Sequence, residues 1–70
     1  MRKITEKTII TAMVNRKCLG YFGKCFTSLS MAERRWVGEE LIRRGWCDEN
    51  LRPTNASMEV VAKNLHLCQC

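Results

Sequence analysis

Several features that define common protein classes are missing from this chain of 70 residues. No run of about 18 apolar residues occurs, so the sequence predicts no membrane-spanning helix. The basic start is not a secretory signal, because Thr5, Glu6 and Lys7 interrupt any apolar segment that would follow it. The chain also has one histidine, no glycine-rich phosphate loop, and no paired carboxylates outside the ion pairs of one helix. We therefore predict a cytoplasmic protein that is not an enzyme and needs no cofactor.

The chain is short, which limits how much core it can build. We predict one domain over residues 1–70, because a chain of this length leaves no room for a second domain. The hydrophobic content of 46% is typical of a globular protein and argues against disorder. A domain of this size buries only about 60% of its unfolded surface. Proteins this small often gain stability from disulfides, a metal or a partner subunit.

Two stretches carry strong helical patterns. Thr5 can cap a helix to about Cys18, on which Ile9, Ile10, Met13 and Val14 form one apolar stripe. The second stretch runs from Ser30 to Trp46, SMAERRWVGEELIRRGW, and contains a capping box, an expected left-handed glycine and a tryptophan that would fold back onto the helix. These signals come from Ser30 with Glu33, from Gly45, and from Trp46 against Leu41. Glu39 with Arg43 and Glu40 with Arg44 are favourable i,i+4 pairs, and Met31, Val37, Gly38, Leu41 and Ile42 form the predicted core stripe.

The remaining segments are less regular. We interpret Leu19–Leu29 as a compact glycine- and aromatic-rich loop with a short extended piece, anchored by Phe22 or Phe26. A link of about eight residues ending at Pro53 suits a short wing-like hairpin or an open corner. A last helix is expected from a Thr54 or Asn55 cap to about Leu67. The sequence thus predicts an all-α, small three-helix domain.

The last helix has two apolar strips on opposite sides. One strip is a seam of Met58, Val61, Leu65 and Cys68, and the other contains Ala56, Val60 and Leu67. Such a helix either lies in a groove of its own domain or docks on another chain, so a homodimer through it is one alternative.

Positive charge is concentrated at the N-terminal end. Residues 1–26 account for the whole net charge of +5, since acidic and basic groups balance in the rest of the chain. Clustered positive charge favours a polyanion or an acidic protein surface, although a solvated basic face that aids solubility has the same pattern. Aromatic residues interleaved with cations, as around Tyr21 and Lys24, are also used to bind single-stranded nucleic acid. A loop merely anchored by aromatic residues has the same pattern.

We therefore predict a nucleic-acid-binding module, such as a transcription regulator, with the basic N-terminal third on phosphates. In the order of its elements, Ser30–Leu67 is similar to small helical DNA-binding regulators, although no diagnostic motif supports the likeness. The predicted contacts to nucleic acid are Arg2, Lys3, Lys7, Arg16, Lys17, Lys24, Arg34 and Arg35.

The alternative is a protein–protein adaptor or inhibitor, for example a viral modulator of host machinery. Trp36 lies off the core stripe of its helix, so it is either covered by the Leu19–Leu29 loop, which is commoner in so small a protein, or exposed as an interface anchor. The basic end would then steer the chain to an acidic partner. The predicted contacts to a protein partner are Trp36, Arg43, Val60 and Leu67.

The five cysteines do not match a disulfide framework, because their number is odd and a cytoplasmic protein keeps its thiols reduced. His66, Cys68 and Cys70 lie close together in the sequence, and Cys47 or the pair Cys18 and Cys25 could supply a fourth zinc ligand. The short Cys-x(2–4)-Cys spacing of structural zinc sites is absent, so we predict no metal site.

Overall fold

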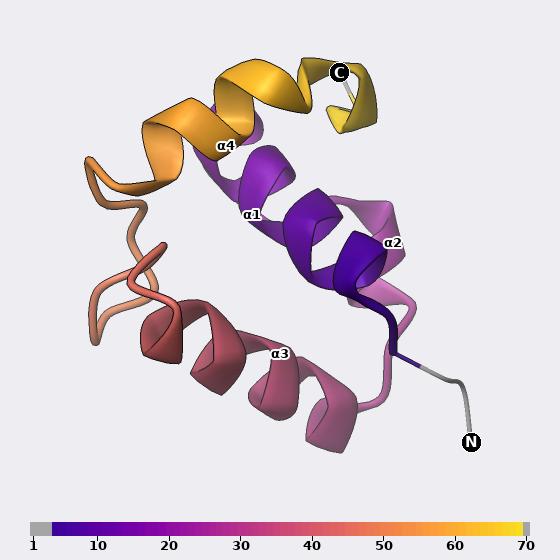
Figure 1. Ribbon diagram of the computed structural model, residues 1–70. Helices are drawn as coiled ribbons and strands as arrows, with labels where there is room; N and C mark the ends of the chain where they lie inside the picture. Colours follow the sequence, from indigo (N-terminus) through magenta and orange to yellow (C-terminus); the bar gives the residue numbers. More distant parts are fainter. Residues whose placement is uncertain (1–3, 70) are drawn as a thin grey trace.

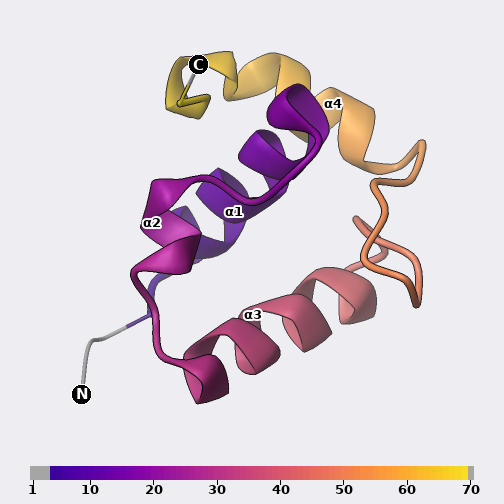
Figure 2. The ribbon, with the colours of Figure 1, turned by 180° about the vertical axis from the view of Figure 1, so that it is seen from behind.

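A computed structural model describes residues 4–69. Within that range the chain forms four α-helices and one short 3₁₀ helix, in an arrangement with no strand. The all-α prediction is confirmed, with one more helix than expected. The bounds are α1 Glu6–Leu19, α2 Lys24–Thr27, α3 Met31–Arg43, α4 Ser57–Lys63 and η1 Leu65–Leu67. Figure 1 and Figure 2 show α1 between α3 on one side and α4 on the other.

Helix α1 is the centre of the fold, because α2, α3, α4 and η1 all pack against it. It begins as predicted at Thr5, whose hydroxyl accepts a hydrogen bond from the Thr8 amide at 3.4 Å. It ends at Gly20, which has a left-handed φ of 75°. Residues 11–15 are all buried, so the middle of α1 is covered nearly all round rather than along one stripe.

The predicted loop over Leu19–Leu29 contains a helical turn rather than an extended piece. Phe26 lies on this turn, α2, and is buried; it stacks on Phe22 with ring centroids 4.0 Å apart. The sequence indicates Phe22 or Phe26 as the anchor; in the structure Phe26 is in the core and Phe22 packs against it, while Tyr21 is exposed.

Helix α3 begins and ends as predicted. The Ser30 amide donates to the Glu33 carboxylate at 2.9 Å and the Glu33 amide donates to the Ser30 hydroxyl at 3.2 Å, which completes the capping box. Gly45 is left-handed with φ 77°, and the Trp46 amide donates to the Leu41 carbonyl at 3.0 Å. This six-to-one hydrogen bond identifies a Schellman motif.

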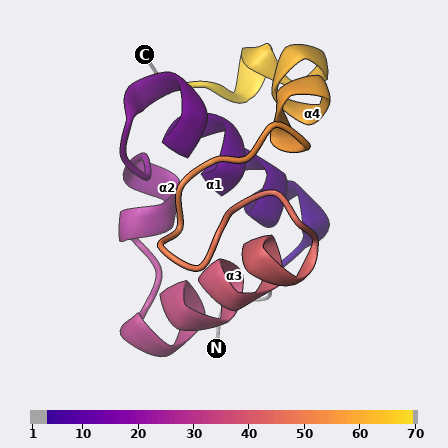
Figure 3. The same cartoon turned by 90° about the vertical axis from the view of Figure 1, so that its left-hand side faces the viewer.

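The link after α3 is irregular and joins distant parts of the fold (Figure 3). An isolated antiparallel bridge connects Cys47 with Pro53, and the Thr54 amide donates to the Trp46 carbonyl at 3.1 Å. In Figure 3 this link, drawn in orange, passes in front of α1 on its way to α4. It closes one side of the domain.

The last helix is shorter than predicted and begins later. The Thr54 hydroxyl donates to the Gly45 carbonyl, so it does not cap the helix, and α4 starts at Ser57 instead. Asn64 ends α4, since its side-chain amide donates to the Val60 carbonyl at 2.9 Å and its backbone leaves the helical region. The 3₁₀ helix η1 follows, and because it has three residues per turn its side chains do not continue the spacing of α4. The Lys63 ammonium and the Glu59 carboxylate form an i,i+4 ion pair on α4, with Nζ and Oε1 3.0 Å apart.

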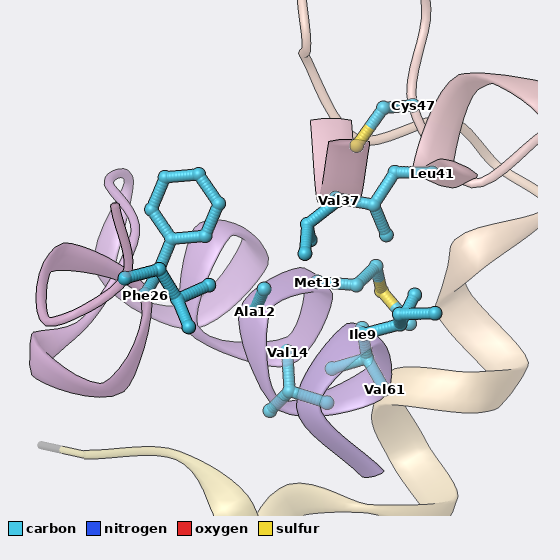
Figure 4. Packing of buried hydrophobic residues seen from close by; sticks show 10 residues of the cluster. Ile9, Ala12, Met13, Val14, Phe26, Val37, Leu41, Cys47 and Val61 are labelled. Atoms are coloured by element: carbon cyan, nitrogen blue, oxygen red, sulfur yellow. The ribbon is translucent and has the colours of Figure 1, made fainter. Parts of the chain in front are cut away.

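Ten buried apolar residues form one core between α1 and the elements around it. Figure 4 shows Val37 and Leu41 on α3 pointing toward Met13 on α1. Met13, Val37 and Leu41 are fully buried. The cluster consists of Ile9, Ala12, Met13, Val14, Phe26, Leu29, Val37, Leu41, Cys47 and Val61. Gly38 lies against Leu51, where an added Cβ would be 3.3 Å from the Leu51 Cδ2 atom.

The C-terminal end of the described chain returns to α1 and α2. The Gln69 amide donates to the Asn15 side-chain carbonyl at 2.8 Å, and the Gln69 side chain contacts the Cys25 sulfur at 2.7 Å. Asn15 is completely buried. Gly23 leaves the room for this contact, because a Cβ there would lie 2.6 Å from Gln69 Oε1 and 2.8 Å from Asn15 Nδ2.

Candidate binding surface on α3 and the adjoining groove

The exposed lysines of the N-terminal third are spread over two helices in the described part of the chain. Lys7 is in the first turn of α1 and Lys17 is in its last turn, about 15 Å apart along the helix axis. Lys24 is the first residue of α2. These three lysines are exposed, whereas Arg2 and Lys3 lie outside the described residues.

Two of the predicted nucleic-acid contacts are arginines that hold the fold together. The Arg16 guanidinium donates to the carbonyl of Leu51 at 3.0 Å and to that of Gly20 at 2.8 Å. The Arg34 guanidinium donates to the Leu29 carbonyl at 3.1 Å and also to the Thr27 carbonyl. Arg35 is different, since its side chain is exposed and its guanidinium makes no hydrogen bond or ion pair to any residue of 4–69.

Trp36 is exposed rather than covered by the Leu19–Leu29 segment. Its exposed fraction is 46%, and Met31 and Ile42, which we placed in the core stripe, are exposed at 77% and 38%. The buried stripe of α3 is narrower than predicted because the Leu19–Leu29 segment packs on α1 instead. We define the outer face of α3 as its exposed residues after the capping serine: Met31, Ala32, Arg35, Trp36, Glu39, Ile42 and Arg43.

A carboxylate at the edge of this face organises the end of α3. Glu40 bonds Arg43 and Arg44, the latter at 3.1 Å, and Arg44 also reaches Glu6 on α1 at 3.1 Å. Arg43 pairs with Glu40 instead of the predicted Glu39. The hydrogen bond from Arg43 is the main reason that the pKa of Glu40 lies below its ordinary value, against an opposing effect of burial. Arg43 keeps most of its side chain exposed, at 72%.

The apolar strips of the last helix are arranged differently from the prediction. Val60 and Leu67 are half-buried, and Val60 packs against the core. In the predicted seam only Val61 is buried, while Met58 and Leu65 are exposed at 55% and 56%. The four residues do not form one continuous apolar strip, because the α-helix ends at Lys63 and residues 65–67 form a 3₁₀ helix.

The cysteines and the histidine do not converge in the described part of the chain. Among residues 4–69, no group of three or more His, Cys, Asp or Glu side chains is placed to hold a metal ion. His66 is exposed, Cys68 is half-buried, and Cys70 lies outside the described residues. Burial raises the pKa of the Cys47 thiol, which suits a core side chain rather than a nucleophile.

A groove that the sequence did not predict lies between α2, α3 and the link. It has a volume of about 690 Å³ and is open to solvent. Its lining is mainly apolar and includes the stacked pair Phe22 and Phe26. The lining residues are Phe22, Phe26, Met31, Ala32, Arg34, Arg35 and Leu51. We call it the α2–α3 groove.

Comparison with known proteins adds no identification. No protein-family model matches the chain, and no curated protein and no solved structure is significantly similar to it. Between residues 4 and 69, no helix combines the length and the apolar character that crossing a bilayer requires. Any functional conclusion therefore has to come from the surface itself.

Proposed function

We propose that this chain is a small, non-enzymatic protein-binding module that recognises another protein through the outer face of α3. The observation that carries the proposal is the exposure of Met31, Trp36 and Ile42 on one helix. Tryptophan and methionine are enriched at protein interfaces, and exposed tryptophan often supplies much of the binding energy. The basic end of the chain would steer association with an acidic partner.

Nucleic-acid binding through the N-terminal third has less support from the geometry. Arg16 and Arg34 are engaged by backbone carbonyls, and Lys7 and Lys17 lie at opposite ends of α1. Phe22 already stacks on Phe26 and has the Arg16 guanidinium over its ring, 5.5 Å from the centroid. Stacking of bases needs aromatic faces that are open to the ligand. Cytoplasmic location remains part of the proposal.

The test asks whether a partner protein depends on the exposed residues of α3, with an exposed methionine on α4 as the control. The chain would be used as bait in an extract of the cells that make it, as wild type, Trp36→Ala, Met31→Ala and the matched control Met58→Ala. We expect a protein that wild type and Met58→Ala retain after nuclease treatment and that the two α3 variants retain about tenfold less. Loss of the captured protein on nuclease treatment, or equal retention by all four baits, would contradict the proposal. Circular dichroism of each variant checks that it is folded.

A further inference from the structure

The α2–α3 groove is a preformed feature of the fold. The Arg34 guanidinium fixes one wall by bonding the carbonyls of Leu29 and Thr27. Leu51 forms part of another wall, and it has an unusual left-handed φ of 60°. Hydrogen bonds hold Leu51 there: its carbonyl accepts from Arg16 at 3.0 Å and its amide donates to the Asp48 carbonyl at 2.9 Å. The lining of the groove is therefore held in place before any ligand binds.

The groove combines an apolar lining with charge of a single sign. Among residues 4–69, its charged lining residues are Arg34 and Arg35, and no carboxylate from that range lines it. Arg16 adds a third guanidinium beside it, over the Phe22 ring. Arg34 and Arg16 are committed to backbone carbonyls, whereas Arg35 is exposed and has no partner within residues 4–69. A ligand that complements this groove is apolar at its centre and negatively charged at its edge.

The size of the groove limits the kind of ligand. A volume of about 690 Å³ lies within the range of about 300–1,000 Å³ that is usual for ligand pockets. The groove is open and shares Met31, Ala32 and Arg35 with the outer face of α3. This shape suits a segment of a polypeptide, which can place apolar side chains in the groove and continue along the helix.

We propose that the α2–α3 groove binds a short acidic segment of a partner protein, with large apolar side chains in the groove and a carboxylate on Arg35. This inference rests on the proposed function and specifies the chemistry of the partner. Phe22 and Phe26, which stack on each other, belong to the apolar lining that would receive the segment's side chains. Arg35 selects acidic over basic segments, because a lysine or arginine of the ligand would face a like charge.

The experiment uses the purified 70-residue chain and synthetic peptides. The probe peptide has two leucines one helical turn apart, flanked by glutamates. Its controls replace the leucines by alanine or the glutamates by lysine, and a single-stranded oligothymidylate of equal charge is a further control. We expect the acidic leucine peptide to bind about tenfold or more tightly than every control. Failure of that peptide to bind would overturn the proposal, as would equal binding of the alanine peptide or of the oligothymidylate.

Variants of the protein locate the binding. Arg35→Glu reverses the free charge at the groove and Ala32→Phe fills the space, while Lys17→Glu makes the same charge change on α1. We expect both groove variants to weaken peptide binding about tenfold or more, and Lys17→Glu to leave it nearly unchanged. Equal effects of Arg35→Glu and Lys17→Glu would show that net charge, not the groove, attracts the peptide.

Two readouts separate this inference from the proposed function and from self-association. Trp36→Ala leaves the groove lining intact, so it should retain peptide binding even though it loses the partner protein. If the wild-type chain captures a partner protein through Trp36 but does not bind the peptide, the groove proposal is rejected and the proposed function stands. Sedimentation at high concentration should show a monomer; a dimer that Ala32→Phe dissociates would identify a second copy as the occupant and overturn the peptide proposal.

Discussion

Replacing Gly23 by alanine tests the contact between the C-terminal end and the centre of the fold. The backbone of Gly23 is extended, with φ −75° and ψ −178°, and alanine can adopt this conformation. If nothing met the new methyl group, the substitution would stabilise the protein by about 0.4–1 kcal/mol through the unfolded state. The structure places Gln69 Oε1 at 2.6 Å and Asn15 Nδ2 at 2.8 Å from the added Cβ, closer than normal contacts.

The sign of the effect therefore depends on whether these neighbours can move. Gln69 can turn toward solvent, but Asn15 is completely buried and lies in the middle of α1. We expect a loss of about 1–3 kcal/mol, the usual cost of an extra group in a packed site. That loss lowers the melting temperature by roughly 4–8 °C per kcal/mol in a domain of this size.

Two measurements check this prediction together. Thermal unfolding by circular dichroism gives the change in stability, and alkylation followed by mass spectrometry gives the reactivity of Cys25. Cys25 should react faster in Gly23→Ala, because the displaced Gln69 side chain no longer contacts its sulfur. The control Gly20→Ala strains a left-handed position, and within residues 4–69 the added Cβ would meet no atom within 4 Å apart from those of its neighbours in the chain. It should leave the reactivity of Cys25 unchanged. A Gly23→Ala variant as stable as wild type would refute the reasoning.

Two further predictions concern α3. Ser30→Ala removes the hydroxyl of the capping box and should cost about 1 kcal/mol, measured by urea unfolding; an unchanged midpoint would show that the cap is not needed. The pKa of Glu40 is lower in the folded chain than in the unfolded chain, so the folded state gains stability from this carboxylate above its unfolded pKa and loses it as the pH falls through the folded pKa. The melting temperature of the wild type should therefore fall more than that of Glu40→Gln when the pH is lowered below about 4.5. Parallel plots of melting temperature against pH for the two proteins would contradict this.

Signals that act over one or two helical turns could be predicted from the sequence. The Ser30–Glu33 box, the left-handed Gly45 and the Thr5 cap involve groups within a few residues of one another, so local chemistry fixes them. The apolar stripe that contains Met13 was also recognisable, because its spacing repeats with the helix.

Features that depend on distant partners could not be predicted. Threonine is a common capping residue, but the Thr54 hydroxyl donates to the Gly45 carbonyl instead of capping a helix. The last helix therefore begins later than the sequence pattern indicates. The exposure of Trp36 depends on where the Leu19–Leu29 segment packs, which no local rule determines. The α2–α3 groove likewise needs Phe22 and Leu51, residues far apart in the chain, to meet beside α3.

The measurement that tests the central claim most directly is binding to random-sequence double- and single-stranded DNA across a salt series. A module that recognises protein through α3 should show no DNA binding at about 150 mM salt, and any binding at low salt should be weak. Micromolar binding at that salt, with a log–log slope near −3 or steeper, would mean about three or more phosphate contacts. If Lys17→Glu with Lys24→Glu then abolished that binding, the N-terminal basic residues, and not the outer face of α3, would be the functional surface.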